Sequence, residues 1–386
     1  MKIAIIGAGI AGLLPAYYLA KQGVQVEVFE AESHAAMKCS RANGGQLSVS
    51  NSEVWNNWHN VVKGIKWMFK DDAPLLIRPS LDLDKLRWII KFLQSVRAGD
   101  QHQRTVRTIK LGLESRILYQ QIIDQEGIEF DHSTCGILHF YKNNKDFDRA
   151  KQLHDMYVDN GCEWTILDAN GVKEKEPSLG HLDDLVGGIW TPSDGVGDIH
   201  KFCTGLAKVL EDKYSVKFRY DKTVENITDL IGYDYIVVAA GINSMKFARQ
   251  VGVNLNLYPV KGYSITIASD NLPTVSLLDD EAKIVTSTLG SRLRVAGTAE
   301  LNGENYDILY SRILPLLRWT ESNLPTVSTE EYSSWACLRP MSPDMMPTVG
   351  KFNNHSNVIF HTGHGHLGWT LSPATAQQVI ELVFNR

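Results

Sequence analysis

Residues 2–12 read KIAIIGAGIAG, and this stretch decides the fold. The apolar run at 2–6 is typical of a buried parallel strand. Three glycines follow at once, and the residues from Leu13 to Gln22 then read as a helix that Gly23 ends. A second strand at 24–30 alternates in polarity and ends in an acid. This βαβ unit predicts a Rossmann-like, dinucleotide-binding domain.

Each glycine of the turn has its own expected role. Gly7 permits the tight turn, Gly9 lets a pyrophosphate approach the backbone, and Gly12 lets the helix pack closely on the strand. The N–H groups at the start of the helix, at Ile10 and Ala11, then face the phosphates. Glu30 is expected to accept hydrogen bonds from the ribose hydroxyls, which disfavours the 2′-phosphate of NADP. The alternative is a glycine-rich turn that binds no nucleotide.

The rest of the chain alternates between helical and extended patterns, which favours an α/β fold. Apolar periodicity predicts helices, and shorter apolar runs predict strands. The nucleotide-binding domain is expected to be discontinuous, with a central parallel sheet, and the remainder to form an α+β substrate domain with a mixed or antiparallel sheet. The expected nucleotide-binding segments are 1–75, 194–252 and 338–386, and the expected substrate segments are 76–193 and 253–337. The expected helices include 84–97, 103–126, 146–160, 200–214, 305–319 and 370–384. The expected strands include 137–141, 216–220, 234–241 and 357–361.

Composition excludes several classes of protein. The 386 residues carry a net charge of −5, and no run of Lys and Arg predicts nucleic-acid binding. The apolar stretches are short and interrupted by charge, as in Trp88-Ile89-Ile90-Lys91-Phe92-Leu93, so no spanning helix is expected. The N-terminal apolar run is interpreted as part of the fold, not as an export signal. The five cysteines are scattered without zinc spacing, which predicts free thiols in a reducing compartment.

The other end of the chain separates FAD from NAD. Residues 361–372 read HTGHGHLGWTLS, a glycine-rich loop that opens the last helix. Its backbone N–H groups are expected to face the pyrimidine edge of a flavin, where negative charge develops on reduction. The three histidines at 361, 364 and 366 lack the helical spacing of zinc motifs, so no metal site is expected.

Several further motifs resemble those of the D-amino-acid oxidase and glycine oxidase superfamily, and within it the small, flavin-carrying subunit of bacterial D-amino-acid dehydrogenases. The resemblance covers nearly the whole chain. It is carried by GAGIAG at 7–12, SRANGGQLS at 40–48, YDYIVVAAG at 233–241, YPVKGYSIT at 258–266, RLRVAGTAEL at 292–301, LRPMSPD at 338–344 and HTGHGHLGWTLS at 361–372.

The resemblance implies FAD as the cofactor and assigns residues to its parts. The ADP half is held by the glycine turn and Glu30, the adenine lies near a strand that carries Val224, and the pyrophosphate also lies beside Ala240 and Gly241. Residues 40–46 line the pyrophosphate and one edge of the flavin, and the C-terminal turn approaches the flavin ring. The implied cofactor-binding residues are Gly7, Gly9, Ile10, Ala11, Gly12, Glu30, Ser40, Arg41, Ala42, Gly44, Gly45, Gln46, Val224, Ala240, Gly241, Gly365, His366, Leu367 and Gly368.

Two residues are expected to hold the substrate. The resemblance implies that Arg339 binds a carboxylate, for which its planar fork is suited, and Tyr263 is expected to add a hydroxyl. The alternatives are a structural arginine before a proline turn and a tyrosine ring in the core, with Arg294 as the next candidate for the carboxylate.

The sequence departs from the family at two places near this site. Cys337 stands where a glycine is expected, and Met345-Met346 replace a glycine-containing pair. Cys337 is expected to be a buried free thiol, with a covalent bond to the flavin as the alternative.

The activity implied is oxidation of a D-amino acid by hydride transfer from Cα to flavin N5, followed by hydrolysis of the imine to a 2-oxo acid and ammonia. The protein orients the substrate and the flavin performs the redox chemistry. Electrons are expected to pass to a quinone or another acceptor. The protein is expected to be cytoplasmic, with at most peripheral membrane contact, and to form a homo- or hetero-oligomer. The alternatives are oxidation of a secondary or small amine, a flavin subunit of a larger dehydrogenase complex, and an NAD-linked dehydrogenase.

Overall fold

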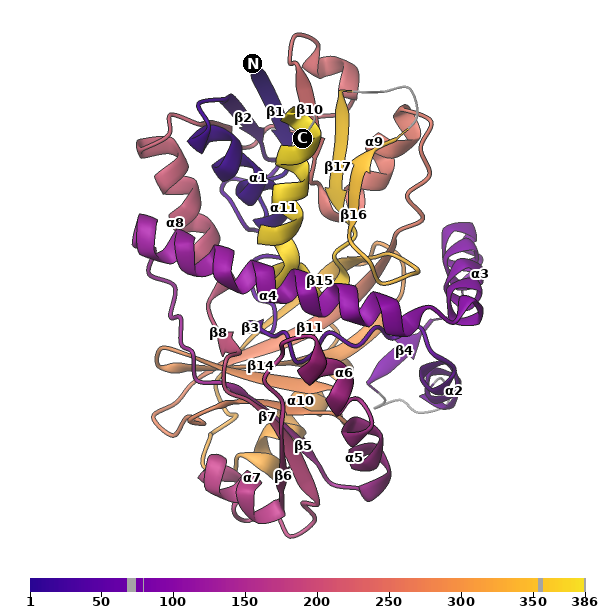
Figure 1. Cartoon of the computed structure of the whole chain (residues 1–386), viewed down its shortest axis with the longest axis vertical. Helices are drawn as coiled ribbons and strands as arrows, with labels where there is room; N and C mark the ends of the chain where they lie inside the picture. Colours follow the sequence, from indigo (N-terminus) through magenta and orange to yellow (C-terminus); the bar gives the residue numbers. More distant parts are fainter. Residues whose placement is uncertain (68–73, 79, 353–356, 385–386) are drawn as a thin grey trace.

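Two sheets form the frame of the molecule, one above the other in Figure 1. The computed structural model describes residues 1–67, 74–78, 80–352 and 357–384. The upper sheet has the strand order β16-β17-β10-β1-β2-β9 and is parallel except for β16. Its strands are β1 (Lys2–Ile6), β2 (Gln25–Phe29), β9 (Lys217–Arg219), β10 (Tyr235–Val238), β16 (Thr348–Lys351) and β17 (Val358–Thr362).

Alternate residues of β1 build separate cores on the two faces of this sheet. Ile3 and Ile5 belong to the cluster under α1 (Ile10–Lys21), α8 (Ile199–Asp212) and α11 (Gly368–Phe384). Ala4 and Ile6 belong to the cluster on the other face, which α9 (Ser244–Gln250) covers. A strand with both faces buried explains why residues 2–6 are apolar without alternation.

The lower sheet contains nine strands, most of them from the segments expected to form the substrate domain. Eight of them follow the order β15-β11-β14-β13-β12-β5-β7-β6, and β4 pairs with β14. The strands are β4 (Leu75–Ile77), β5 (Ile137–Tyr141), β6 (Thr165–Asp168), β7 (Gly187–Thr191), β11 (Tyr258–Ala268), β12 (Ser276–Asp279), β13 (Ile284–Leu289), β14 (Arg292–Leu301) and β15 (Ser333–Met341).

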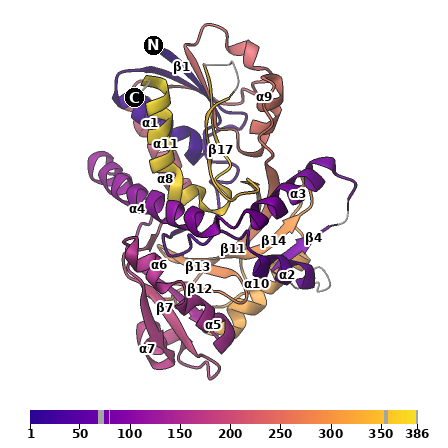
Figure 2. The ribbon, with the colours of Figure 1, turned by 45° about the vertical axis from the view of Figure 1, so that its right-hand side comes forward.

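The remaining helices cover this sheet or connect the two sheets. In Figures 1 and 2, α4 (Gln101–Glu126) crosses the middle of the molecule, and its Tyr119 donates a hydrogen bond to the Trp369 carbonyl of α11. A short pair of strands, β3 (Gln46–Leu47) and β8 (Gly195–Val196), also lies between the sheets. The other helices are α2 (Trp58–Trp67), α3 (Leu83–Ala98), α4 (Gln101–Glu126), α5 (Asn144–Lys151), α6 (His154–Asp159), α7 (Ala169–Lys175) and α10 (Tyr310–Asn323), with 3₁₀ turns η1 (Pro177–Leu179), η2 (Ile227–Leu230), η3 (Gly241–Asn243) and η4 (Gly365–Leu367).

The structure confirms the α/β class and departs from the expected elements in a few places. The helix predicted at 146–160 is two helices, because a tight turn at Gln152 ends α5. Val224 lies in a loop after β9, not on a strand. The boundaries predicted at 75/76 and 337/338 fall inside β4 and β15, and both strands pair within the lower sheet.

Candidate active site

The glycine turn after β1 leaves an open position at Gly9. Gly7 has φ +104, and a Cβ there would lie 2.6 Å from the Ala239 carbonyl oxygen. A Cβ on Gly12 would collide with the Gly7 carbonyl oxygen. At Gly9, by contrast, the nearest atom to an added Cβ is the Ser40 hydroxyl, at 3.4 Å. The fold itself therefore requires Gly7 and Gly12, whereas Gly9 leaves room that a pyrophosphate would fill.

Glu30 is fixed beside this turn. Its carboxylate accepts hydrogen bonds from the Ala8 N–H at 2.7 Å and from the Glu32 N–H at 3.0 Å. At the N-terminus of α1, Gly9 provides no side-chain cap, and the Ile10 N–H donates to the Ser40 hydroxyl at 3.1 Å. Ser40 thus satisfies one N–H group at the positive end of α1, the end at which helices bind anions.

The neighbouring strand ends at the same edge of the upper sheet. The Ala239 N–H donates to the Ile6 carbonyl, so Ala240 and Gly241 lie next to the glycine turn. The loop of Val224 runs past Glu30, since the Lys222 N–H donates to the Glu30 carbonyl. The carboxyl ends of β1, β2 and β10 thus meet where a doubly wound sheet binds its ligand.

Residues 40–46 lead from this edge onto the lower sheet. Side chains of the lower sheet hold the carbonyl groups of this segment in place. Arg294 donates to the Asn43 carbonyl and to the Thr266 hydroxyl, so both partners of this guanidinium belong to the scaffold. The other contacts are Ser264 Oγ to Ala42 O at 2.7 Å, Ser287 Oγ to Gly44 O at 2.7 Å, and Gln46 Nε2 to Ser276 Oγ at 2.8 Å.

Arg41 is the one arginine of this segment, and its guanidinium makes no ion pair within the described residues. It lies 5.1 Å from the Trp335 ring centroid and contacts the Met37 sulfur at 3.0 Å. A cation without a carboxylate partner fits a phosphate group, and Arg41 follows Ser40, whose hydroxyl contacts the N-terminus of α1.

The C-terminal turn separates its three histidines into two roles. His361 donates from Nδ1 to the Ala11 carbonyl at 2.6 Å, and its Nε2 and the Nε2 of His364 both contact the Thr375 hydroxyl. These two rings therefore join α1, β17 and α11. His366 points elsewhere, with its ring stacked on Trp55 at a centroid distance of 4.4 Å.

Arg339 lies where the two sheets meet, on the same face of the lower sheet as Gly262. Its guanidinium occupies the space that a side chain at position 262 would fill, with Nε 2.9 Å from an ideal Cβ there. Within the described residues it has no hydrogen bond or ion pair. Desolvation by burial lowers the pKa of Arg339 to about 10, so the group stays charged at neutral pH.

His366 completes this candidate site. Burial, and then the charge of Arg339, lower the pKa of His366 to about 3, so its ring is neutral. Its buried Nε2 has no hydrogen-bond partner among the described residues. A half-buried cation and a buried polar nitrogen, each without a hydrogen-bond partner among the described residues, predict a ligand with an anionic and a polar group.

Tyr263 does not belong to this site. In the pairing of β11 with β15, Tyr263 is opposite Ala336, whereas Val260 is opposite Arg339. Adjacent residues of a strand point to opposite faces, so Tyr263 and Arg339 lie on different faces of the sheet. The Tyr263 hydroxyl donates to Glu300 at 2.7 Å inside the core. The predicted contact with the carboxylate is therefore wrong, and the alternative of a core tyrosine holds.

The prediction of five free thiols is also wrong. Cys39 and Cys337 form a disulfide with a Cα–Cα distance of 5.3 Å, although 298 residues separate them. Cys135, Cys162 and Cys203 are free. The bond joins the residue before Ser40 to the strand that carries Arg339, and it leaves the Cys337 sulfur with a protein partner in place of a flavin.

Two residues of the candidate site were not predicted from the sequence. Gly262 lies in the YPVKGYSIT motif, and only the strand register shows that it makes room for Arg339. Trp55 lies in a tryptophan-rich stretch without a recognisable motif. Among the described residues, no group of three or more His, Cys, Asp or Glu side chains is placed to hold a metal ion.

Comparison with known proteins agrees with this geometry. The family model described as FAD dependent oxidoreductase (DAO) matches residues 2–382. The chain is 46% identical to D-amino acid dehydrogenase 3 of Mesorhizobium japonicum, over 99% of this chain and 97% of that protein. Its fold is similar to glycine oxidase from Geobacillus kaustophilus (TM-score 0.79, 19% identity, covering 100% of this chain and 94% of that one). It is also similar to L-proline dehydrogenase from P. horikoshii (TM-score 0.75, 16% identity, covering 100% and 93%).

Proposed function

Because the chain belongs to the FAD dependent oxidoreductase (DAO) family, we propose that it oxidises D-amino acids to 2-oxo acids and ammonia. The cofactor is FAD, which supplies the hydride acceptor when bound. The observation that carries the proposal is the unpaired guanidinium of Arg339 at the junction of the two sheets. The name of the Mesorhizobium japonicum relative supports D-amino acids as the class of substrate.

Arg339 is assigned the substrate carboxylate. A carboxylate that leaves water for this site loses its hydration and needs a charged partner. The guanidinium offers two parallel, charge-assisted hydrogen bonds, which fix the orientation of the substrate as well as its affinity. The guanidinium lies against the backbone at Gly262, which has no side chain to displace it, so its position is set by β11.

His366 is assigned the substrate amine. Departure of a hydride from Cα is helped by a neutral amine, whose lone pair stabilises the developing positive charge. A neutral imidazole accepts a hydrogen bond from an amine N–H without repelling the charge that develops there. The stacked ring of Trp55 holds this imidazole in place.

FAD itself is assigned to the residues that meet at the edge of the upper sheet. The open Gly9, the start of α1 at Ile10 and the guanidinium of Arg41, which makes no ion pair among the described residues, suit the pyrophosphate. Glu30 suits the ribose, and the turn at Gly365–Gly368 suits the ring. This proposal also includes the two expected domains and the remaining expected cofactor-binding residues, which are Ser40, Ala42, Gly44, Gly45, Gln46, Val224, Ala240 and Gly241.

Electrons are proposed to leave to a quinone or another acceptor. No helix in the described parts of the chain is long and apolar enough to cross a membrane. We therefore propose a cytoplasmic protein with at most peripheral membrane contact, acting alone or as a homo- or hetero-oligomer.

Anaerobic bleaching of the flavin tests the activity. The purified holoprotein is mixed with D-alanine, other D-amino acids, their L-enantiomers, glycine, sarcosine and D-proline, and the flavin absorbance is followed. Bleaching by primary D-amino acids well ahead of their L-enantiomers is the expected result. Bleaching by secondary amines alone would replace the proposed substrate class, and no bleaching by any amine would contradict the activity.

A further inference from the structure

The outer face of α3 carries an exposed row of aliphatic side chains. Leu83, Leu86, Ile90 and Leu93 follow the spacing i, i+3, i+7 and i+10, which places them on one face of a helix. Their exposed fractions are 66%, 54%, 46% and 37%, and Leu81, just before the helix, is fully exposed. An apolar stripe of this length on a surface helix indicates an interaction site.

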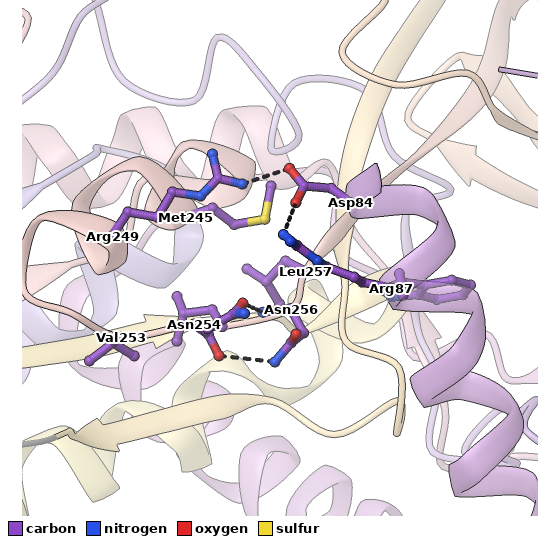
Figure 3. Close-up of a pocket in the computed structure, with 10 residues that line it drawn as sticks. Asp84, Arg87, Met245, Arg249, Val253, Asn254, Asn256 and Leu257 are labelled. Carbon is purple, nitrogen blue, oxygen red and sulfur yellow. Dashed lines mark hydrogen bonds and ion pairs between the residues drawn. The ribbon is translucent and has the colours of Figure 1, made fainter. Parts of the chain in front are cut away.

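The opposite face of α3 already holds the helix against the protein. Trp88 donates a hydrogen bond from Nε1 to the Met341 carbonyl at 2.8 Å, and its ring lies 6.2 Å from that of Tyr258 in β11, centroid to centroid. Figure 3 shows the N-terminal turn, where Asp84 pairs with Arg249 of α9 at 2.6 Å and with Arg87 at 3.6 Å. The helix is thus anchored by its inner side, and the outer stripe is not needed for that packing.

Positive charge accompanies the stripe. Residues 81–99, which carry the stripe, contain four Lys or Arg and two Asp, a net charge of +2 in a chain whose total is −5. On α3 itself, Lys91 and Arg97 are exposed, and within the described residues neither makes an ion pair. The helix therefore presents leucine and isoleucine between cations, on the outer edge of the molecule in Figures 1 and 2.

We propose that this stripe, with Lys91 and Arg97, docks the protein on an anionic lipid bilayer. A helix with this composition lies in the plane of the interface, with aliphatic side chains among the acyl chains and Lys and Arg at the phosphates. A two-fold contact between copies would instead bring the same cations together, which charge repulsion opposes. The proposal assigns a surface to the peripheral membrane contact proposed above. It rests on the proposed oxidation of amino acids only for the reason why the protein would dock, because lipid binding itself needs no turnover.

Vesicle sedimentation of the FAD-bound protein tests the surface. Vesicles of phosphatidylcholine with phosphatidylglycerol should bind the protein, those of phosphatidylcholine alone should bind it much less, and added salt should weaken the binding. Lys91→Gln with Arg97→Gln should lower the partition coefficient about thirtyfold, from roughly 1 kcal/mol per cation. Leu86→Ser with Ile90→Ser should lower it at least about tenfold.

Ile117→Ser is the matched control, because Ile117 of α4 is 62% exposed and lies outside the stripe. Equal loss in this variant, or no binding to anionic vesicles, would overturn the proposal. A dimeric mass that Leu86→Ser with Ile90→Ser converts to a monomer would assign the stripe to a second copy and overturn it as well. Anaerobic flavin reduction by D-amino acids should be unchanged in all these variants, so a failure of docking and a failure of the proposed activity give different results.

Discussion

The guanidinium of Arg339 lies against the backbone of Gly262, in space that any side chain at position 262 would occupy. The two residues come from neighbouring strands, and Gly262 is paired with Cys337, two residues from Arg339. Gly262→Ala should therefore move the guanidinium without removing its charge. We expect flavin content to be unchanged and half-maximal flavin reduction to need at least about tenfold more D-amino acid. An unchanged substrate dependence in anaerobic titration would show that the position of Arg339 does not matter.

Tyr263→Phe separates the core role of this residue from a catalytic one. The change removes the hydrogen bond to Glu300, which keeps Arg78 and Lys261 as partners. Loss of a buried hydrogen bond should lower the free energy of unfolding by about 1–2 kcal/mol. The rate and substrate dependence of flavin reduction should stay at the wild-type value. A large loss of reduction rate with little loss of stability would return Tyr263 to the site.

Gly9→Val should abolish FAD binding without unfolding the apoprotein. Gly9 has an extended backbone conformation that other residues adopt, and only the Ser40 hydroxyl lies near an added Cβ. The branched side chain would instead fill the room assigned to the pyrophosphate. Gly64→Ala is the matched control, because nothing described lies within 4 Å of a Cβ there. Full flavin content in purified Gly9→Val would disprove the assignment of the turn.

Local sequence patterns predicted the βαβ unit of the upper sheet and the last helix better than the surroundings of Arg339. The glycine turn, Glu30 and the last helix belong to local patterns whose physics is contained in a few consecutive residues. The site around Arg339 depends on strand register, which decides that Gly262 faces Arg339 and that Tyr263 does not. The Cys39–Cys337 bond likewise joins residues that no local pattern relates. Contacts of this kind come from the tertiary fold, and a single sequence does not contain their geometry.

The disulfide should contribute to stability, because it joins two distant parts of the chain. Cys39→Ser with Cys337→Ser, or treatment with a reductant, should lower the free energy of unfolding by about 2–4 kcal/mol. Cys135→Ser is the control, since Cys135 is a free thiol. Acid precipitation should leave the flavin in the supernatant, since the Cys337 sulfur is bonded to Cys39. A protein pellet that stays yellow, or a free energy of unfolding that the reductant leaves unchanged, would contradict the disulfide.

Stopped-flow reduction of the flavin under nitrogen tests most directly whether Arg339 holds the substrate carboxylate. Arg339→Lys keeps the charge but loses the planar fork, and Arg339→Met loses both. Both variants should retain FAD, and half-maximal reduction should need much more D-amino acid, with Met worse than Lys. The limiting rate of reduction should also fall, because a misplaced Cα slows hydride transfer. Near-normal affinity and rate in Arg339→Met would contradict the account, because the carboxylate would then be held elsewhere.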